Sequence, residues 1–195
     1  FIASAFKFAI GLYLALLLNE NMPFKAMLRA MVLIPFIVPT VLSALAFWWI
    51  FDSQFSIISW SLKHLGLISQ NINFLGDTTW ARVCVIFANI WRGVPFVAIT
   101  LLAGLQTVSP SLYEAATMDG AGAWGRFFDV TLPQLRGVLT VVILLRTVWD
   151  FKEFDLIYLL TGGGPINRTQ TLPLLVYQQA FGLNRMGMAA SYAVV

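Results

Sequence analysis

Long apolar runs separated by polar stretches dominate the pattern along the chain. A bilayer core needs about 20 mostly apolar residues per helix. Four runs approach that length, and a fifth begins near the end of the sequence: residues 2–18, 32–51, 80–105, 135–160 and 188–195. The pattern therefore predicts an all-α membrane protein, a polytopic helical bundle with four complete spans and the start of a fifth.

Three longer connections join these runs. Residues 52–78 are mostly polar, residues 106–134 are amphipathic, and residues 161–187 begin with glycines and asparagines. Pro35 and Pro39 lie near the start of the second run. Neighbouring helices in a membrane bundle re-satisfy the backbone groups that a proline frees, so we expect the second run to form one span.

Composition confirms that the solvent is largely lipid. The chain has 195 residues, of which 59% are hydrophobic and 11% charged, whereas soluble domains carry about 25% charged residues. Mean hydropathy is +0.80. The net charge of +3 comes from twelve Lys and Arg that are scattered singly. Nucleic-acid binding needs a basic stripe or cluster, so we expect no nucleic-acid partner.

Reactive and metal-binding residues are few. Cys84 stands alone inside an apolar run, and His64, the single histidine, lies in a polar stretch. No Cys/His pattern has metal-ligand spacing, so we expect no metal and no cofactor. The sequence begins at Phe1 inside one apolar run and ends at Val195 inside another. We expect both ends to be truncations of a longer chain.

Charge alone leaves the orientation in the membrane open. If residues 19–31 and 106–136 face the cytoplasm, four basic residues lie inside and three outside, which decides nothing under the positive-inside rule. The inner four would be Lys25, Arg29, Arg126 and Arg136, and the outer three Lys63, Arg168 and Arg185.

The connection 106–134 predicts two short helices that meet at a glycine corner. Ser109 followed by Pro110 is a helix start, and we expect Gly120 and Gly122 to end that helix by a left-handed turn. A second short helix is expected over residues 123–131, stopped by the next proline. Its apolar side chains recur at helical spacing: Trp124, Phe127, Phe128 and Leu132. A plain interfacial amphipathic helix is the alternative interpretation.

A spaced motif within this connection resembles the cytoplasmic element of binding-protein-dependent ABC importer permeases. That pattern reads Glu-Ala-Ala, three residues, Gly, nine residues, a β-branched residue, one residue, Leu-Pro. It is met by Glu114-Ala115-Ala116, Gly120, Val130 and Leu132-Pro133. The resemblance implies the type I importer permease fold over a single domain, 1–195, with 106–134 as a cytoplasmic coupling loop that docks into a cleft of an ATPase subunit. The implied coupling residues are Glu114, Ala115, Ala116, Asp119, Gly120, Leu132 and Pro133.

A second resemblance points to the carbohydrate-uptake branch of these permeases. It rests on FDLIYLLTGGGP at 154–165, Thr171-Leu172 and YQQAF at 177–181. It is similar to the larger permease of maltose-type transporters, without that protein's extra extracytoplasmic domain, for which residues 52–78 are too short. The resemblance implies a multi-pass bacterial inner-membrane protein. Its implied partners are a second related permease in a heterodimer, two cytoplasmic ATPase subunits, an extracytoplasmic solute-binding protein and a carbohydrate solute.

Charged residues inside the predicted spans are candidates for the solute site, since such charges are expensive in lipid. Arg146, Asp150 and Glu153 are spaced i, i+4, i+7, which places them on one helix stripe. We expect them either to line the pocket or to pair with one another as a structural stripe. In the third span, Asn89 and Arg92 precede a Gly-Val-Pro sequence that predicts a helix break at binding depth. Lys7 and Arg82 are expected to snorkel from span ends.

The resemblance adds residues to this set. The positions matching Arg92, Gly93, Phe96, Trp149, Asp150 and Glu153 line the sugar pocket in the maltose-type relative. Together with the charged positions, the candidate substrate-binding residues are Asn89, Arg92, Gly93, Phe96, Arg146, Trp149, Asp150 and Glu153.

The predicted function is therefore an ABC importer permease that moves a carbohydrate, an oligosaccharide in size, by alternating access. The chain has no Walker-type loop, so ATP hydrolysis falls to a separate subunit and the chain is not an enzyme. The alternative within the superfamily is a non-sugar or anionic solute such as a glycerol phosphodiester, an oligouronate or a polyol. An intramembrane enzyme is a further alternative, but the chain lacks the nucleophile, base or metal ligands that such an enzyme needs. A secondary transporter or channel leaves the 114–133 motif unexplained.

Overall fold

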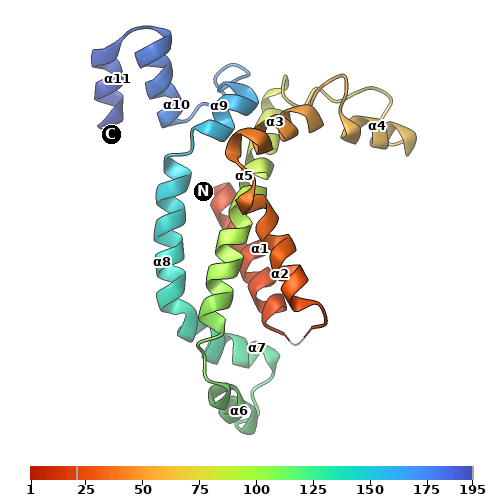
Figure 1. Cartoon of the computed structure of the whole chain (residues 1–195), viewed down its shortest axis with the longest axis vertical. Helices are drawn as coiled ribbons and strands as arrows, with labels where there is room; N and C mark the ends of the chain where they lie inside the picture. Colours follow the sequence, from red (N-terminus) through yellow and green to blue (C-terminus); the bar gives the residue numbers. More distant parts are fainter. Residues whose placement is uncertain (21, 195) are drawn as a thin grey trace. The chain divides into compact units, whose positions relative to one another are not determined.

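The computed structural model describes residues 1–20 and 22–194, and every regular element among them is helical (Figure 1). The predicted fold class, an all-α membrane protein, is confirmed. In chain order the helices are α1 Ile2–Asn19, α2 Lys25–Ile37, α3 Thr40–Ile50, α4 Ile57–His64, α5 Thr78–Leu105, α6 Pro110–Met118, α7 Ala123–Gly125, the π-helix η1 Arg126–Thr131, α8 Leu132–Phe151, α9 Asp155–Thr161, α10 Leu172–Tyr177, the π-helix η2 Gln178–Gly182 and α11 Met186–Ala193.

Three helical segments in the described part of the chain are long and apolar enough to cross a membrane: Ile2–Asn19, Thr78–Leu105 and Ala123–Phe151. They confirm the first and third predicted spans. The second predicted span is a broken pair, because α2 ends at Ile37 and α3 starts at Thr40 with Pro39 as its N-cap. The pair passes the membrane test only when both helices are taken together.

The one proline break in the described spans lies at a different place from the one expected. Pro39 lies at a break, but Pro35 lies inside α2 and Pro95 inside α5. The predicted break at Gly93-Val94-Pro95 is therefore wrong, and α5 runs unbroken for 28 residues. A proline removes one backbone N–H and clashes with the preceding turn, yet a helix of this length keeps most of its other hydrogen bonds.

The fourth predicted span, 135–160, differs from the structure at both ends. The helical segment starts earlier, at Ala123, and ends at Phe151, after which residues 152–154 separate α8 from α9. Short helices also lie in connections for which no helix was predicted, namely α4 within 52–78 and α10 with η2 within 161–187. The last helix begins at Met186, two residues before the predicted run 188–195 (188 − 186), and Val195 lies outside the described residues.

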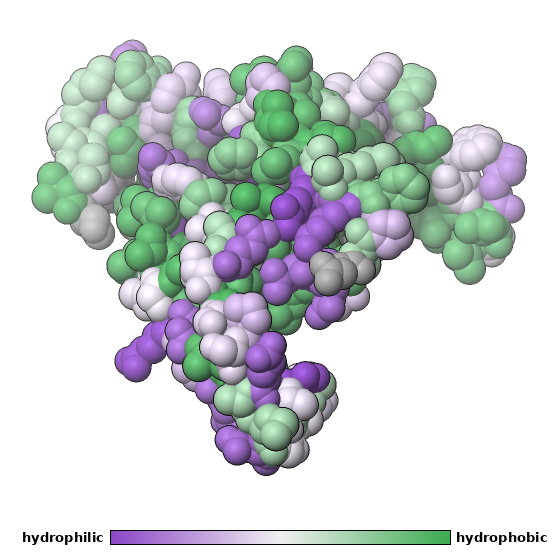
Figure 2. Space-filling view, turned by 60° about the horizontal axis from the view of Figure 1, so that its bottom comes forward, coloured by the Kyte–Doolittle hydropathy of each residue, from purple (hydrophilic) through white to green (hydrophobic). Residues whose placement is uncertain are grey.

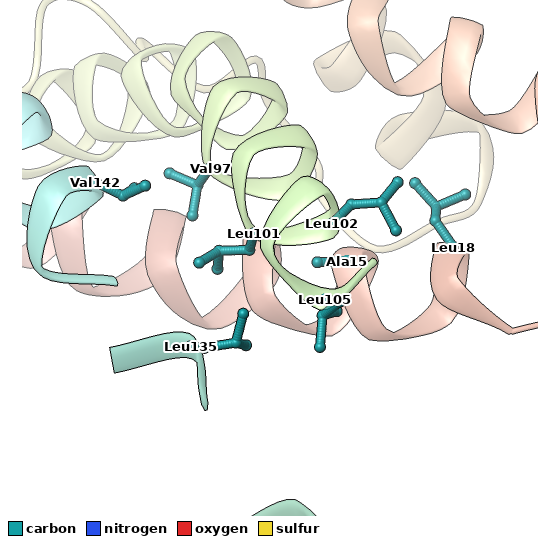
Figure 3. Close-up of a cluster of buried hydrophobic side chains, with 8 residues drawn as sticks. All are labelled: Ala15, Leu18, Val97, Leu101, Leu102, Leu105, Leu135 and Val142. Carbon is teal, nitrogen blue, oxygen red and sulfur yellow. The ribbon is translucent and has the colours of Figure 1, made fainter. Parts of the chain in front are cut away.

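The chain groups into two compact units, which we describe separately. The first unit comprises Phe1–Ile37 and Trp91–Val148. Its core is a cluster of aliphatic side chains contributed by α1, the second half of α5 and α8 (Figure 3): Ala15, Leu18, Val97, Leu101, Leu102, Leu105, Leu135 and Val142. A Cβ on Gly11 would lie 2.6 Å from Cγ1 of Val97. Small residues let membrane helices approach this closely, so Gly11 fixes where α1 crosses α5.

The second unit comprises Val38–Ile90 and Trp149–Val195. Helix α3 packs against α9, whose Leu156, Ile157 and Leu160 are buried. Phenylalanine rings extend this core, with Phe47 stacked on Phe51 at a centroid distance of 5.8 Å and Phe74 at 5.7 Å from Phe51. The glycine turn after α9 is closely hydrogen-bonded, with the Thr169 hydroxyl donating to the Gly164 carbonyl at 2.7 Å.

Candidate functional site

The connection 106–134, which we call the corner element, folds as a helix, a left-handed turn and a second helix. Pro110 occupies the first position of α6 and Ser109 the N-cap, as predicted, although the Ser109 side chain makes no capping bond. Gly120 has φ +81°. The Ala121 N–H donates to the Ala116 carbonyl at 2.9 Å and the Gly120 N–H to the Thr117 carbonyl at 3.0 Å. These two bonds define a Schellman motif, which requires the glycine.

The second half of the corner element corrects two expectations. Gly122 is not left-handed, because its φ is −72° and it serves as the N-cap of α7. Pro133 does not stop the second helix, which passes through η1 into α8. In the π-helix the Leu132 N–H donates to the Phe127 carbonyl, five residues back. The wider π-turn is compatible with the missing N–H of Pro133, so the second helix of the corner element and the membrane span form one continuous helix.

Side-chain hydrogen bonds brace α6 against η1. The hydroxyl oxygens of Tyr113 and Thr131 lie 3.0 Å apart, and Thr131 is only 4% exposed. Arg126 donates from Nη1 to the Thr117 hydroxyl at 3.3 Å, and that hydroxyl donates to the Tyr113 carbonyl at 2.7 Å. The two short helices are therefore held as one body, so that a load on α6 is passed to η1.

Much of the corner element's surface is apolar and open. Met118 is 88% exposed and Trp124 is 76% exposed. The Trp124 and Phe128 rings stack with centroids 6.2 Å apart. Figure 2 shows the α6 end as a mosaic of hydrophilic and weakly hydrophobic residues. Among the predicted coupling residues, Glu114, Ala115, Asp119, Gly120 and Pro133 are exposed, while Ala116 and Leu132 are half-buried. Exposed aromatic rings of this kind are typical of a protein interface.

Two cationic side chains are buried next to each other in the first unit. Lys7 on α1 is 0% exposed and Arg146 on α8 is 7% exposed. A Cβ on Gly93 would lie 2.6 Å from Cδ and Cε of Lys7 and 2.7 Å from Nη2 of Arg146. The expectation that Lys7 snorkels to a span end is therefore wrong. Its stem crosses α5 at Gly93, whose missing side chain leaves the necessary space.

The remaining candidates of the first unit lie on the same helix as Gly93. Arg92 and Phe96 are half-buried on α5. The Phe96 ring lies 6.3 Å from the ring of Phe36 on α2. The burial of Lys7 was not predictable from the sequence, since nothing in its local pattern distinguishes a buried lysine from a snorkelling one.

The other four candidates belong to the second unit. Asn89 donates from Nδ2 to Oε2 of Glu153 at 3.3 Å. Glu153 lies beyond the end of α8, so the predicted helical stripe does not include it. Trp149 and Asp150 are half-buried on the last turn of α8. The Asn89–Glu153 hydrogen bond joins two predicted solute-site residues of the second unit.

An aromatic cluster follows Glu153 in the second unit. Phe154 stacks on Tyr158 with centroids 5.2 Å apart, and Tyr177 lies 5.0 Å from Phe154 and 5.2 Å from Tyr158. A hydrogen bond with Tyr158 raises the pKa of Tyr177 above its usual value. The sequence indicated these three aromatic residues only as members of the motifs at 154–165 and 177–181, without predicting that they cluster. No group of three or more His, Cys, Asp or Glu side chains that would hold a metal occurs among the described residues.

The chain matches the family model for the inner membrane component of binding-protein-dependent transport systems over residues 7–195, and it belongs to this family. It is 37% identical over 195 residues to the trehalose/maltose transport system permease protein MalF of Thermococcus litoralis, covering 100% of this chain and 65% of that protein. It is 37% identical over 186 residues to the sulfoquinovosyl glycerol transport system permease protein SmoG of Agrobacterium fabrum, covering 95% and 60%. The chain thus spans about two thirds of the length of these relatives or less.

A solved structure shares the fold. A chain of a bacterial ABC transporter involved in the import of the acidic polysaccharide alginate superimposes with a TM-score of 0.88 at 24% identity, covering 99% of this chain and 68% of that one. The predicted ABC importer permease fold is confirmed, and the protein is a multi-pass membrane protein.

Proposed function

We propose that this chain is the membrane-spanning permease subunit of an ATP-binding-cassette importer that translocates a carbohydrate of oligosaccharide size. The observation that carries the proposal is the corner element, in which the Glu114–Gly120 motif ends in a Schellman turn and the second helix continues into a membrane span. Family membership supports transport. The names of the two relatives, trehalose/maltose and sulfoquinovosyl glycerol permeases, support a sugar or a glycoside as the solute.

The corner element is proposed to receive force from a cytoplasmic ATPase. Ala115, Ala116 and Gly120 allow a partner backbone to approach closely, while Glu114 and Asp119 offer charge. Leu132-Pro133 lies where the element joins α8. Because Tyr113 and Thr131 tie α6 to η1, and η1 continues into α8 without a loop, a pull on α6 reorients the span. This arrangement supports alternating access driven by ATP hydrolysis in a separate subunit.

The proposed assembly follows from this role. Two ATPase subunits, a second related permease and an extracytoplasmic solute-binding protein complete the importer in a bacterial inner membrane. Residues 106–134 then face the cytoplasm, and residues 52–78 face the opposite side, since one span, α5, separates them. In this assignment residues 1–195 act as one transmembrane permease domain.

The eight predicted solute-site residues are proposed to bind sugar. Sugar hydroxyls need donors and acceptors, and pyranose C–H faces pack on aromatic rings. In the second unit Asn89 and Glu153 supply the polar groups and Trp149 a ring, and in the first unit Arg92 supplies donors and Phe96 a ring. An anionic or non-sugar solute is the second candidate: a glycerol phosphodiester, an oligouronate or a polyol. The observation that favours an anion is the pair of buried cations, Lys7 and Arg146, at Gly93.

The test is ATP hydrolysis by the full complex in liposomes with its binding protein, across a panel of neutral and acidic oligosaccharides, a phosphodiester and a polyol. We expect one sugar class to stimulate hydrolysis several-fold. Stimulation by the phosphodiester or polyol instead would keep the importer and reject the oligosaccharide. Uptake of any solute that persists without the ATPase would reject the importer assignment itself.

A further inference from the structure

Two adjoining hollows lie where α3 leads into α4 in the second unit. The first is lined by apolar side chains of the end of α3 and of the following turn: Ala46, Trp49, Ile50, Phe55 and Ile57. The second shares Phe55 and Ile57 with the first and adds Gln54, Ser56, Trp60, Lys63 and Asn71. Neither hollow is lined by a carboxylate. An apolar hollow beside a hollow with a cation and amides has the polarity of an amphiphile.

The frame of these hollows is well hydrogen-bonded. The Asp52 Oδ1 accepts from the backbone N–H of Gln54 at 2.7 Å and of Phe55 at 2.9 Å. Asn71 donates from Nδ2 to the Ser53 carbonyl at 3.0 Å. Turns of this kind hold a backbone in one conformation. Phe55 is therefore presented outward by a fixed turn.

Helix α4 is anchored by its polar side and leaves its apolar side uncovered. The Ser56 hydroxyl caps α4 by accepting from the Ser59 N–H at 3.2 Å, and the buried Ser59 hydroxyl accepts from the Ile72 N–H at 3.2 Å. By contrast Ile57 is 57% exposed and Trp60 is 56% exposed. A fixed, exposed apolar face of this kind marks an interaction surface.

The first hollow adjoins the exposed apolar side of α3, since Trp49 and Ile50 belong to its lining. Helix α3 belongs to the broken membrane span, and its Leu42, Leu45 and Trp49 are at least half exposed. Trp49 on its last turn and Trp60 on α4 are the residues that membrane proteins place at the lipid–water interface. Hydrocarbon next to α3 therefore extends without interruption into the first hollow. An occupant that reaches the hollow from the membrane along α3 would be a lipid acyl chain.

The second hollow offers the chemistry of a headgroup. Lys63 is an exposed cation in the last turn of α4 and the sole charged residue of the lining. A lysine at the membrane surface attracts anionic lipid, while Asn71 and Gln54 supply hydrogen-bonding groups. We propose that the two hollows bind one anionic phospholipid, with an acyl chain against Trp49, Ile50 and Phe55 and the phosphate at Lys63. The proposal needs the membrane but not the identity of the transported solute.

The experiment uses the complete importer in nanodiscs that contain zwitterionic lipid with or without anionic phosphatidylglycerol. A photoreactive benzoylphenylalanine replaces Trp60, and adducts are identified by mass spectrometry. We expect phosphatidylglycerol adducts that fall about fivefold in Lys63→Met, which removes roughly one lysine–headgroup attraction. Lys152→Met is the matched control, because Lys152 is exposed in the same unit but lines neither hollow, and adduct yield there should not change.

Two results would overturn the proposal. Cross-linking of position 60 to the binding protein or to the second permease, in place of lipid, would make the face a protein interface. Equal adduct yields for zwitterionic and anionic lipid, unaltered by Lys63→Met, would remove the headgroup site. Both results leave the importer assignment intact, because transport is measured separately on the same preparations.

Discussion

Replacing Gly93 by alanine tests whether the buried cations depend on the missing side chain. The new Cβ would lie 2.6 Å from Lys7 Cδ and Cε, whereas ordinary contact begins at 3.4 Å, so the atoms must separate by 0.8 Å (3.4 − 2.6). Lysine tips usually move aside easily. Here Lys7 is 0% exposed and Arg146, the other neighbour, 7% exposed, so neither side chain has open space to enter.

The stability lost in Gly93→Ala must be compared with the stability that alanine gains over glycine through its higher helix propensity. Extra atoms in a packed interior cost about 1–3 kcal/mol, while alanine gains about 1 kcal/mol over glycine within a helix. Gly137→Ala isolates the second effect, because a Cβ at Gly137 of α8 meets nothing within 4 Å. A change of 1 kcal/mol shifts Tm by about 2–4 °C in a chain of this size. Gly93→Ala should therefore melt about 2–12 °C below Gly137→Ala.

The assay is thermal unfolding of the full-length permease in detergent, followed by the loss of its monodisperse peak in size-exclusion chromatography. Two double variants separate shape from charge. In Lys7→Ala/Gly93→Ala the clashing Lys7 atoms are gone, so most of the penalty of Gly93→Ala should disappear. In Lys7→Met/Gly93→Ala the atoms remain but the charge is absent, so the penalty should persist. Equal melting of Gly93→Ala and Gly137→Ala would refute the reasoning.

Three further changes test other contacts. Tyr113→Phe removes the hydroxyl contact with Thr131, should cost about 1 kcal/mol and should speed hydrogen exchange in α6; unchanged exchange would show that the contact does not brace the corner element. Asn89→Leu removes the Nδ2 donor to Glu153 and should raise the apparent KM for solute in uptake assays while the complex still assembles; an unaltered KM would remove Asn89 from the solute site. Asp150→Ala should alter the range of solutes that stimulate ATP hydrolysis, and an unchanged range would favour a structural role for this carboxylate.

The sequence predicted the spans well where a single uninterrupted apolar run formed a single helix. Residues 2–18 and 80–105 became α1 and α5 with little change at their ends. The effect of prolines was harder to predict, because each proline disfavours a helix interior locally but only one of them breaks a helix. Pro35 and Pro95 lie inside helices, whereas Pro39 begins a new one. Packing of the surrounding helices decides between these outcomes, and single-sequence periodicity carries no information about it.

The candidate site was predictable where spacing alone determines geometry. The Schellman turn at Gly120 follows from a glycine placed after a helix-forming segment, and the structure has it. Continuation through Pro133 was missed, because a π-turn leaves no sequence signal. Burial of Lys7 was missed for a related reason, since the space for its stem is provided by Gly93, 86 positions away in the chain (93 − 7). Short helices such as α4 span too few turns for periodicity to stand out.

The most direct test of the central claim, that the corner element couples ATP hydrolysis to transport, is solute uptake by proteoliposomes carrying the complete importer with Gly120→Trp. Gly120 has φ +81°, which a side chain strains, and nothing lies within 4 Å of its Cβ position. A bulky residue there both disturbs the turn and obstructs docking. Gly122→Ala is the control, since its backbone is extended and its surroundings are also open. We predict that Gly120→Trp inserts into the membrane normally but loses ATPase binding or ATP-driven uptake, while Gly122→Ala retains both. A Gly120→Trp complex that co-purifies with its ATPase and transports at the wild-type rate would contradict the account.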